Sequence, residues 1–196
     1  MRGISIVIAQ FLWVMIRPFF TLYAFSRYHD IWRIKEVIKK KRHRLLEHAY
    51  YDYFAARCSW ISHHSNFLGV PFFPHGPLGV FISRNAVIGK NCVIMQQVTI
   101  GSNPLADSKL QGSPVIGDNV FIGAGAKIVG GIRIGNNCRI GANVTISGNL
   151  PENTLAVCST PRSINISHLD NLHFLEADGN RFCCADGKWV REECDS

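Results

Sequence analysis

The sequence lacks several features on which common classes of site depend. None of its 7 cysteines belongs to a CxxC pair, and no histidine occurs between His75 and His168. Zinc sites built from paired cysteines, or from several histidines in the central part of the chain, are therefore not expected, and we predict no metal. Residues 1–69 contain no glycine-rich phosphate-binding loop, which argues against an N-terminal nucleotide-binding domain.

Charged residues are also few. They make up 18% of the chain against 47% hydrophobic residues, so a packed protein is expected rather than a disordered one. The net charge of +7 is uneven: residues 27–57 carry nine Lys/Arg against four Asp/Glu, and the last 32 residues carry three against seven. This segregation argues against a nucleic-acid-binding protein. The basic segment faces an anionic membrane or an acidic partner, or else it is a solvated helix face.

No uninterrupted apolar run is long enough to cross a bilayer. Residues 4–16 are largely apolar before Arg17 and Pro18 intervene, and this run falls short of the roughly 20 residues that a spanning helix needs. We predict a hydrophobic helix that packs in an oligomer or lies in a membrane surface, with a peripheral membrane contact through residues 1–57. Apolar residues then recur at helical spacing; they are Ile31, Ile34, Ile38, Leu45, Ala49 and Tyr53.

A six-residue repeat dominates the middle of the chain. Isoleucine recurs every six residues, with one irregular stretch in the series, at Ile82, Ile88, Ile94, Ile100, Ile116, Ile122, Ile128, Ile134, Ile140 and Ile146. Outside the irregular stretch the fifth position of each hexad is small or aliphatic, and Cys92 and Cys138 occupy two such positions. Each hexad is predicted to be a short strand and a tight turn. Because no single hexad can bury its own isoleucine, the units must stack into a solenoid.

The pattern Ile-Gly-x-x-small-x resembles that of the left-handed β-helix acyltransferases. The segments HGPLGVFISRNAVIGKNCVIMQQVTIGS and GSPVIGDNVFIGAGAKIVGGIRIGNNCRIGANVTI, with the closing LPENTLAVCSTPRSI, are similar to the serine acetyltransferase-like branch, which includes O-acetyltransferases from polysaccharide gene clusters. The resemblance implies a three-sided prism with three hexads per turn. It also implies a homotrimer that binds acetyl-CoA in the groove between neighbouring prisms.

The resemblance assigns roles to several residues. His75 with Gly76 matches the catalytic histidine of the family, and a neutral imidazole suits the deprotonation of an attacking hydroxyl, which typically contributes about 10²–10⁴ in rate. Ala124 and Ala142, one turn apart, would let the pantetheine arm of acetyl-CoA approach the backbone, and Arg162 would pair with a CoA phosphate. From the residues alone, a cap on the first coil is the favoured interpretation of His75, and the resemblance reverses this preference. The alanines equally well simply suit tight turns.

Several departures from the serine enzymes matter. Pro74 stands where those enzymes carry an aspartate, and Ser113-Pro114 stands where they carry a second histidine. Together with the short N-terminal region, these two absences favour a sugar hydroxyl over serine as the acceptor. The segment 158–162 has lost a glycine and its proline has moved by one position, which bears on the CoA contacts of that segment instead.

The irregular stretch 103–114 loops out by ten residues. Such an insertion either borders the binding site, as it does in the family, or is a tolerated surface loop. In the first case Asp107 and Ser113 contact the acceptor, together with Gln96 or Gln97, which follow the QxVT pattern of the family.

These observations predict a mainly β protein: a left-handed parallel β-helix of hexapeptide repeats with an α-helical N-terminal extension. The expected division is a helical region over 1–69, the β-helix over 70–164 and an acidic C-terminal extension over 165–196. The expected activity is acetyl-CoA-dependent acetylation of a sugar hydroxyl in a capsular or other bacterial surface polysaccharide. Serine O-acetyltransferase and a non-catalytic assembly protein are the alternatives. Since acetyl-CoA is a cytoplasmic metabolite and the cysteines suit a reducing compartment, the prism is expected in the cytoplasm, with the N-terminal region at the inner face of the membrane.

Overall fold

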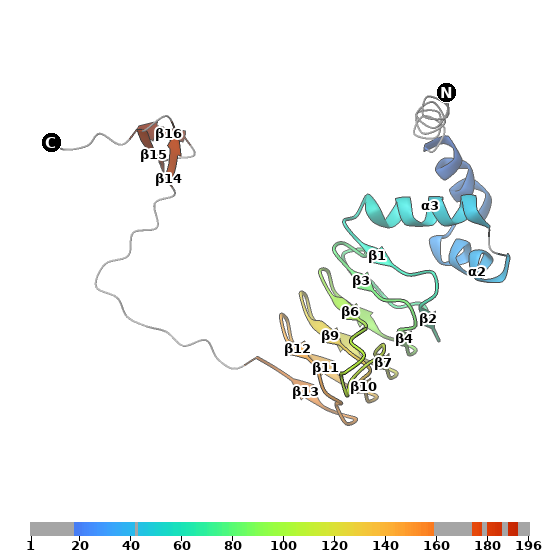
Figure 1. Cartoon of the computed structure of the whole chain (residues 1–196). Helices are drawn as coiled ribbons and strands as arrows, with labels where there is room; N and C mark the ends of the chain where they lie inside the picture. The colour runs from blue at the N-terminus through green and yellow to red at the C-terminus, as the bar shows by residue number, and fades with distance from the viewer. Residues whose placement is uncertain (1–17, 42, 159–173, 178–179, 186–187, 192–196) are drawn as a thin grey trace. The chain divides into compact units, whose positions relative to one another are not determined.

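The computed structural model describes residues 18–41, 43–158, 174–177, 180–185 and 188–191. The chain divides into two compact units, Met1–Ser159 and Thr160–Ser196. Three parallel sheets in the first unit form the faces of a prism (Figure 1). The boundary between helices and prism differs from the one that the sequence predicted at residue 69. In the structure the last helix of this region ends at Ala55 and the prism begins at Trp60.

The three faces of the prism carry thirteen short strands. Face 1 contains β1 (Trp60–Ile61), β3 (Phe81–Ile82), β6 (Thr99–Gly101), β9 (Lys127–Val129) and β12 (Thr145–Ile146). Face 2 contains β2 (Asn66–Phe67), β4 (Val87–Ile88), β7 (Val115–Ile116) and β10 (Arg133–Ile134). Face 3 contains β5 (Val93–Ile94), β8 (Phe121–Ile122), β11 (Arg139–Ile140) and β13 (Leu155–Ala156).

The repeated isoleucines form the core of the prism, as the repeat predicted. All ten are at most 9% exposed. On face 1, Ile100 is in register with Ile82 on one side and Ile128 on the other, and faces 2 and 3 stack their isoleucines in the same way. Burial of one such side chain contributes roughly 1.5–3 kcal/mol, so the stack is the main source of stability in a solenoid whose strands are two or three residues long.

Asparagines hold the corners between faces 2 and 3. Asn119, Asn137 and Asn153 occupy equivalent places on successive coils, with φ angles of 56°, 55° and 58°. Asparagine tolerates this left-handed conformation better than other residues with a side chain. Their amides also bond to one another along the edge, at 3.3 Å and 3.2 Å, so the turn geometry repeats from coil to coil.

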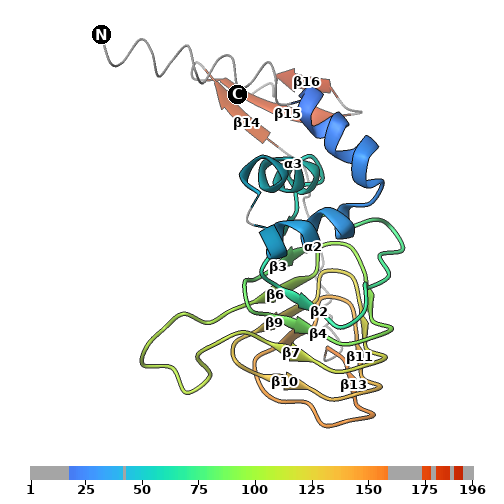
Figure 2. The same ribbon diagram turned by 90° about the vertical axis from the view of Figure 1, so that its right-hand side faces the viewer.

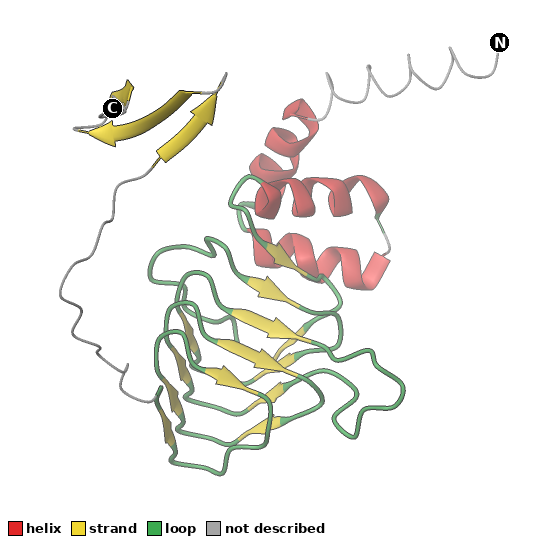
Figure 3. Ribbon diagram, turned by 60° about the vertical axis from the view of Figure 1, so that its left-hand side comes forward, coloured by secondary structure: helices red, strands yellow, loops and turns green. Residues whose placement is uncertain are grey.

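Helices cover the first coil of the prism (Figures 1 and 3). Residues 18–28 are helical, and α2 (Ile31–Lys41) and α3 (Arg44–Ala55) follow. Leu45, which the single helical pattern placed on the apolar side, is 41% exposed, whereas Leu46 is 2% exposed. The reason is that α3 starts anew at Arg44 behind the N-cap His43, which shifts the helical phase by one residue. The predicted apolar helix over 4–16 lies outside the described residues.

Aromatic packing joins α2 to the first coil. The Trp32 ring stacks on Phe73 at 5.7 Å and meets Phe67 edge-on at 5.4 Å. Beside it, the buried Lys35 donates a hydrogen bond of 2.6 Å from its Nζ to the carbonyl oxygen of Ser65. The first coil lacks the isoleucine repeat, and these contacts replace the coil that would otherwise stack on it.

Lys35 makes the stability of this junction dependent on pH. Burial, followed by the charge of Lys39, lowers the pKa of Lys35 from 10.5 to about 8. The unfolded chain therefore binds the proton of Lys35 more tightly than the folded chain does. Below pH 8 the folded protein carries the buried charge and is less stable, and it recovers this stability as the pH rises toward 10.5. We expect the free energy of unfolding of the wild type, measured against Lys35→Met in urea, to gain roughly 1–3 kcal/mol between pH 7.5 and pH 10. A difference that stays constant with pH would show that Lys35 is not perturbed.

The second unit contains an antiparallel sheet of β14 (Phe174–Ala177), β15 (Asn180–Ala185) and β16 (Lys188–Arg191). The sequence analysis predicted an acidic extension over 165–196 and assigned no secondary structure to it. Among the described residues of the whole chain, no helix combines the length and the apolar character that crossing a membrane requires.

Candidate functional site

The corners between faces 3 and 1 bring together residues from every coil. We call this line of corners the His75 edge; it consists of residues 73–80, 95–98, 123–126, 141–144 and 157–158. Backbone hydrogen bonds join the successive corners: Gln97 N–H to Leu78 O at 2.8 Å, Gly125 N–H to Gln96 O at 3.0 Å, and Asn143 N–H to Ala124 O at 2.8 Å. The structure thus places His75, Gln96, Gln97, Ala124 and Ala142 along a single edge.

His75 lies in an exposed turn at the top of this edge. The turn closes with a 3.0 Å hydrogen bond from the Gly76 N–H to the carbonyl oxygen of Phe73, and Gly76 has a φ of 68°. The imidazole itself is exposed. No side chain in the described part of the chain forms a hydrogen bond to this imidazole. Pro74 stands where the serine enzymes carry an aspartate, and no described residue of the same chain supplies a carboxylate in its place.

The residues at the outermost point of each corner present backbone donors. Among the described residues, the N–H groups of Gln96, Ala124 and Ala142 donate no hydrogen bond, whereas those of Gln97, Gly125 and Asn143 are bonded to the preceding coil. The Gln96 Oε1 atom is buried and has no partner among the described residues. The edge therefore offers a row of N–H donors to a ligand that lies along it.

The small residues of the edge are required by its tight packing. A Cβ atom on Gly123 would lie 2.7 Å from the backbone nitrogen of Ala142, and one on Gly125, where φ is 70°, would collide with the Asn143 side chain. Ala124 is half-buried and Ala142 is exposed. A ligand can therefore approach the backbone here without meeting a long side chain.

The irregular loop lies at a different edge, between faces 1 and 2, and stands out from the prism (Figure 2). Asn103 and Gly112 close it with reciprocal backbone hydrogen bonds of 2.8 Å and 2.9 Å, and Ser113 Oγ lies 2.7 Å from Ser102 Oγ. Asp107 is exposed. Within one chain the predicted acceptor residues Asp107 and Ser113 are therefore not at the His75 edge. The predicted CoA contact Arg162 lies outside the described residues.

A groove beneath α3, which we call the α3 groove, was not predicted. It consists of two cavities of about 650 Å³ and 620 Å³ that share four lining residues. Their linings include Lys39, Arg44, Glu47, His48, Tyr51, Asp52, Trp60, Ser62, His63, His64 and Arg84. A signal was present in the sequence: Arg44, Glu47, His48 and Tyr51 follow the i, i+3, i+4, i+7 spacing of one helix face.

His63 is the buried centre of the α3 groove. Its Nδ1 lies 2.7 Å from the Tyr51 hydroxyl, and its exposed fraction is 7%. Burial, and next the His64 ring at 4.0 Å, lower the pKa of His63 below 6.5. Burial likewise raises the pKa of Tyr51. The pair is therefore neutral at pH 7, a state that costs little to bury.

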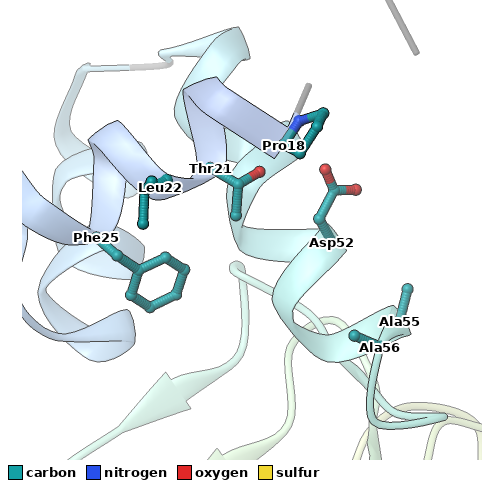
Figure 4. A pocket seen from close by; sticks show the side chains of 7 residues that line it. All are labelled: Pro18, Thr21, Leu22, Phe25, Asp52, Ala55 and Ala56. Atoms are coloured by element: carbon teal, nitrogen blue, oxygen red, sulfur yellow. The ribbon is translucent and has the colours of Figure 1, made fainter. Parts of the chain in front are cut away.

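An apolar pocket of about 600 Å³ lies between the helical residues 18–28 and α3 (Figure 4). It is lined by Pro18, Thr21, Leu22, Phe25, Asp52, Ala55 and Ala56. Phe19, Leu22 and Tyr23 on the same helix are 59–73% exposed. The pocket lacks the converging polar groups that a catalytic site requires.

Comparison with known proteins agrees with this architecture. Residues 113–148 match the family described as bacterial transferase hexapeptide (six repeats). A serine acetyltransferase of Synechococcus elongatus is 41% identical over 56 residues, which cover 29% of this chain and 22% of that protein.

Two solved structures show the same likeness over a longer span. Serine acetyltransferase isoform 3 of Entamoeba histolytica, in complex with cysteine, has 32% identity and a TM-score of 0.55 over 70% of this chain and 50% of its own. The Neisseria gonorrhoeae serine acetyltransferase, in complex with serine, has 27% identity and a TM-score of 0.56 over 67% of this chain and 52% of its own. The chain spans about half the length of these solved relatives. The predicted left-handed β-helix, and the resemblance to acyltransferases of the serine acetyltransferase-like branch, are confirmed.

Proposed function

We propose that this chain, with the fold of the hexapeptide-repeat acyltransferases, is an acetyl-CoA-dependent O-acetyltransferase whose general base is His75. The observation that carries the proposal is the His75 edge. It places an exposed imidazole at the head of a row of N–H donors and small residues from Gln96 to Ala142. That arrangement suits a long, thin thioester whose reactive end lies near His75.

The reaction needs a general base and hydrogen-bond donors that stabilise the negative charge of the tetrahedral intermediate. The acceptor hydroxyl attacks the thioester carbonyl while the neutral imidazole of His75 removes its proton. The tetrahedral intermediate then collapses, the C–S bond breaks, and the CoA thiolate takes the proton back from the imidazolium. The N–H groups of Gly125 and Asn143 are already bonded, so donors to the oxyanion come from the outermost corner positions instead.

Serine is the acceptor that the comparisons support best, because the relatives with similar folds are serine acetyltransferases and one of them was solved with serine. This reverses the preference that the sequence indicated. A sugar hydroxyl remains the second candidate for one specific reason. Trp60 is 47% exposed, and its backbone N–H bonds at 3.0 Å to the carbonyl oxygen of Val80, the last residue of the first corner of the His75 edge; an aromatic surface suits a sugar ring better than serine.

A transfer assay distinguishes the acceptors. Purified protein and radiolabelled acetyl-CoA are incubated with L-serine, hexose 1-phosphates, nucleotide sugars or bacterial glycans, and labelled product and free CoA are quantified together. Label on serine alone supports the first acceptor, and label on a sugar alone supports the second. Free CoA that appears at the background rate with every acceptor would contradict acetyl transfer.

A homotrimer is the assembly that this function requires. The loop with Asp107 and the His75 edge occupy different edges of one prism, so a loop that covers the site must come from a neighbouring copy. In a trimer with closed rotational symmetry, the loop of each copy covers the His75 edge of one neighbour, and the loop of the other neighbour covers its own edge.

The N-terminal region gives a separate prediction. The exposed Phe19 and Leu22, followed by the basic segment 27–57, fit a peripheral contact of a cytoplasmic enzyme with the inner face of a membrane. We expect a variant that lacks residues 1–26 to leave the membrane fraction and remain trimeric by light scattering. If the variant loses its trimer, and the full-length protein never sediments with membranes, the helix belongs to the assembly instead.

A further inference from the structure

The α3 groove has two chemically different ends. Lys39 of α2 and Arg44 of α3 lie at one end, and Arg84, from the corner between β3 and β4, lines both cavities. The stacked rings of Tyr51 and Trp60 lie at the other end. His63, His64 and Glu47 connect the two. A ligand that fills this groove must combine an anionic group with a ring.

The basic end fits a phosphate. Among the described residues, the guanidinium groups of Arg44 and Arg84 have no hydrogen-bond or ion-pair partner, and the Lys39 Nζ has a contact of 3.5 Å with Asn66 Oδ1. Glu47 is the carboxylate in this part of the lining, so positive charge prevails. Guanidinium groups bind phosphate through paired, charge-assisted hydrogen bonds.

The aromatic end fits the apolar face of a sugar ring. The Trp60 ring lies parallel to Tyr51, with centroids 4.1 Å apart and an angle of 9°. One face of the indole is therefore covered, yet the residue is 47% exposed, which leaves the other face open. Phe81, the register partner of Trp60, is 46% exposed and extends this surface along face 1.

Polar groups between the two ends suit sugar hydroxyls. The carboxylate of Glu47 lines both cavities and can accept a hydrogen bond from a hydroxyl, and the neutral imidazole of the buried His63 is fixed by the Tyr51 hydroxyl. Several rigid donors and acceptors beside an aromatic surface distinguish a sugar from a simple anion.

We propose that the α3 groove binds a phosphorylated sugar, with its phosphate at Lys39, Arg44 and Arg84 and its ring on Trp60. Gly79 N–H bonds to Arg57 O at 3.1 Å, and Ser59 bonds to Pro77, so the segment before Trp60 lies beside residues 77–79 of the His75 edge. If the acceptor is a sugar, the second candidate above, this ligand is that acceptor; this role rests on the proposed function, whereas the binding site does not.

Calorimetric titration of the full-length protein without acetyl-CoA tests the site. The probes are glucose 1-phosphate, galactose 1-phosphate, glucose, inorganic phosphate and L-serine. We expect a hexose 1-phosphate to bind at least about tenfold more tightly than inorganic phosphate or glucose. The double variant Arg44→Gln/Arg84→Gln should raise that Kd at least about tenfold, because charge-assisted hydrogen bonds are lost. Trp60→Ala should weaken binding of the hexose phosphate and leave inorganic phosphate unchanged.

One variant serves as the control, with folding checked by circular dichroism. Lys40→Gln removes an exposed lysine beside Lys39 that does not line the groove, and it should not alter the Kd. Absence of binding by both hexose phosphates, or a Kd that the double variant leaves unchanged, overturns the site. Tighter binding of L-serine than of the hexose phosphates overturns it as well. Hexose phosphate binding without any acetyl transfer supports the site and contradicts the proposed function instead.

Discussion

Replacing His75 with alanine should lower kcat for acetyl transfer at least about a hundredfold and leave the Kd for acetyl-CoA nearly unchanged. In the proposed mechanism the imidazole acts on the acceptor proton in the transition state, whereas acetyl-CoA is held by the unbonded backbone N–H groups from Gln96 to Ala142. Since the His75 side chain is exposed and makes no hydrogen bond within the described residues, its removal should not disturb the fold. Steady-state kinetics and a separate titration with CoA measure the two effects.

A second histidine variant controls for the loss of an exposed imidazole. His29 is exposed and has a φ of 61°, and His29→Asn preserves this backbone conformation because asparagine tolerates it. We expect its kcat to match the wild type. Turnover in His75→Ala within about threefold of the wild type would remove His75 from the mechanism, because a general base contributes about 10²–10⁴.

Two inactive variants should restore activity to each other if the site lies between neighbouring copies. The first is His75→Ala. The second replaces residues 104–111 with Asn-Gly, which can join Asn103 to Gly112 because these residues already pair as antiparallel neighbours. Each variant alone should fall at least about a hundredfold in kcat, since every site lacks either its base or its loop.

Co-expression of the two variants with different tags gives mixed trimers. In a random equal mixture, a site is complete when the copy with intact His75 meets a neighbour with an intact loop, which occurs at about one half times one half, or a quarter, of the interfaces. The mixed protein should therefore recover about a quarter of the wild-type activity. Mixed trimers that stay inactive would show that the base and the loop act within one chain, or that the loop has no part in the site.

The hexad period made the prism predictable in detail. One buried isoleucine every six residues fixes the strand, the turn and the stacking register together, and Ile82, Ile100 and Ile128 stack as the period requires. The period also fixes which corners share an edge. The alignment of Ala124 with Ala142 was therefore visible in the sequence, whereas the position of His75 above them came from the resemblance.

The ends of the prism were less predictable because aromatic packing replaces the repeat there. Phe67 and Phe73 lie beneath Trp32 in place of an isoleucine ladder, so the period gives no sign that a coil begins at Trp60. The α3 groove escaped prediction for a related reason. Arg84 reaches it from a corner of the prism and Arg44 from a helix, and no local pattern shows that two such elements meet.

A crystal structure of the full-length protein with CoA tests the central claim most directly. The account predicts that the pantetheine arm lies along the His75 edge against Ala124 and Ala142, with its sulfur within about 4 Å of the His75 imidazole, close enough for the imidazolium to return its proton to the thiolate. CoA bound at another edge of the prism, or in the α3 groove, with the His75 edge open, would contradict the account.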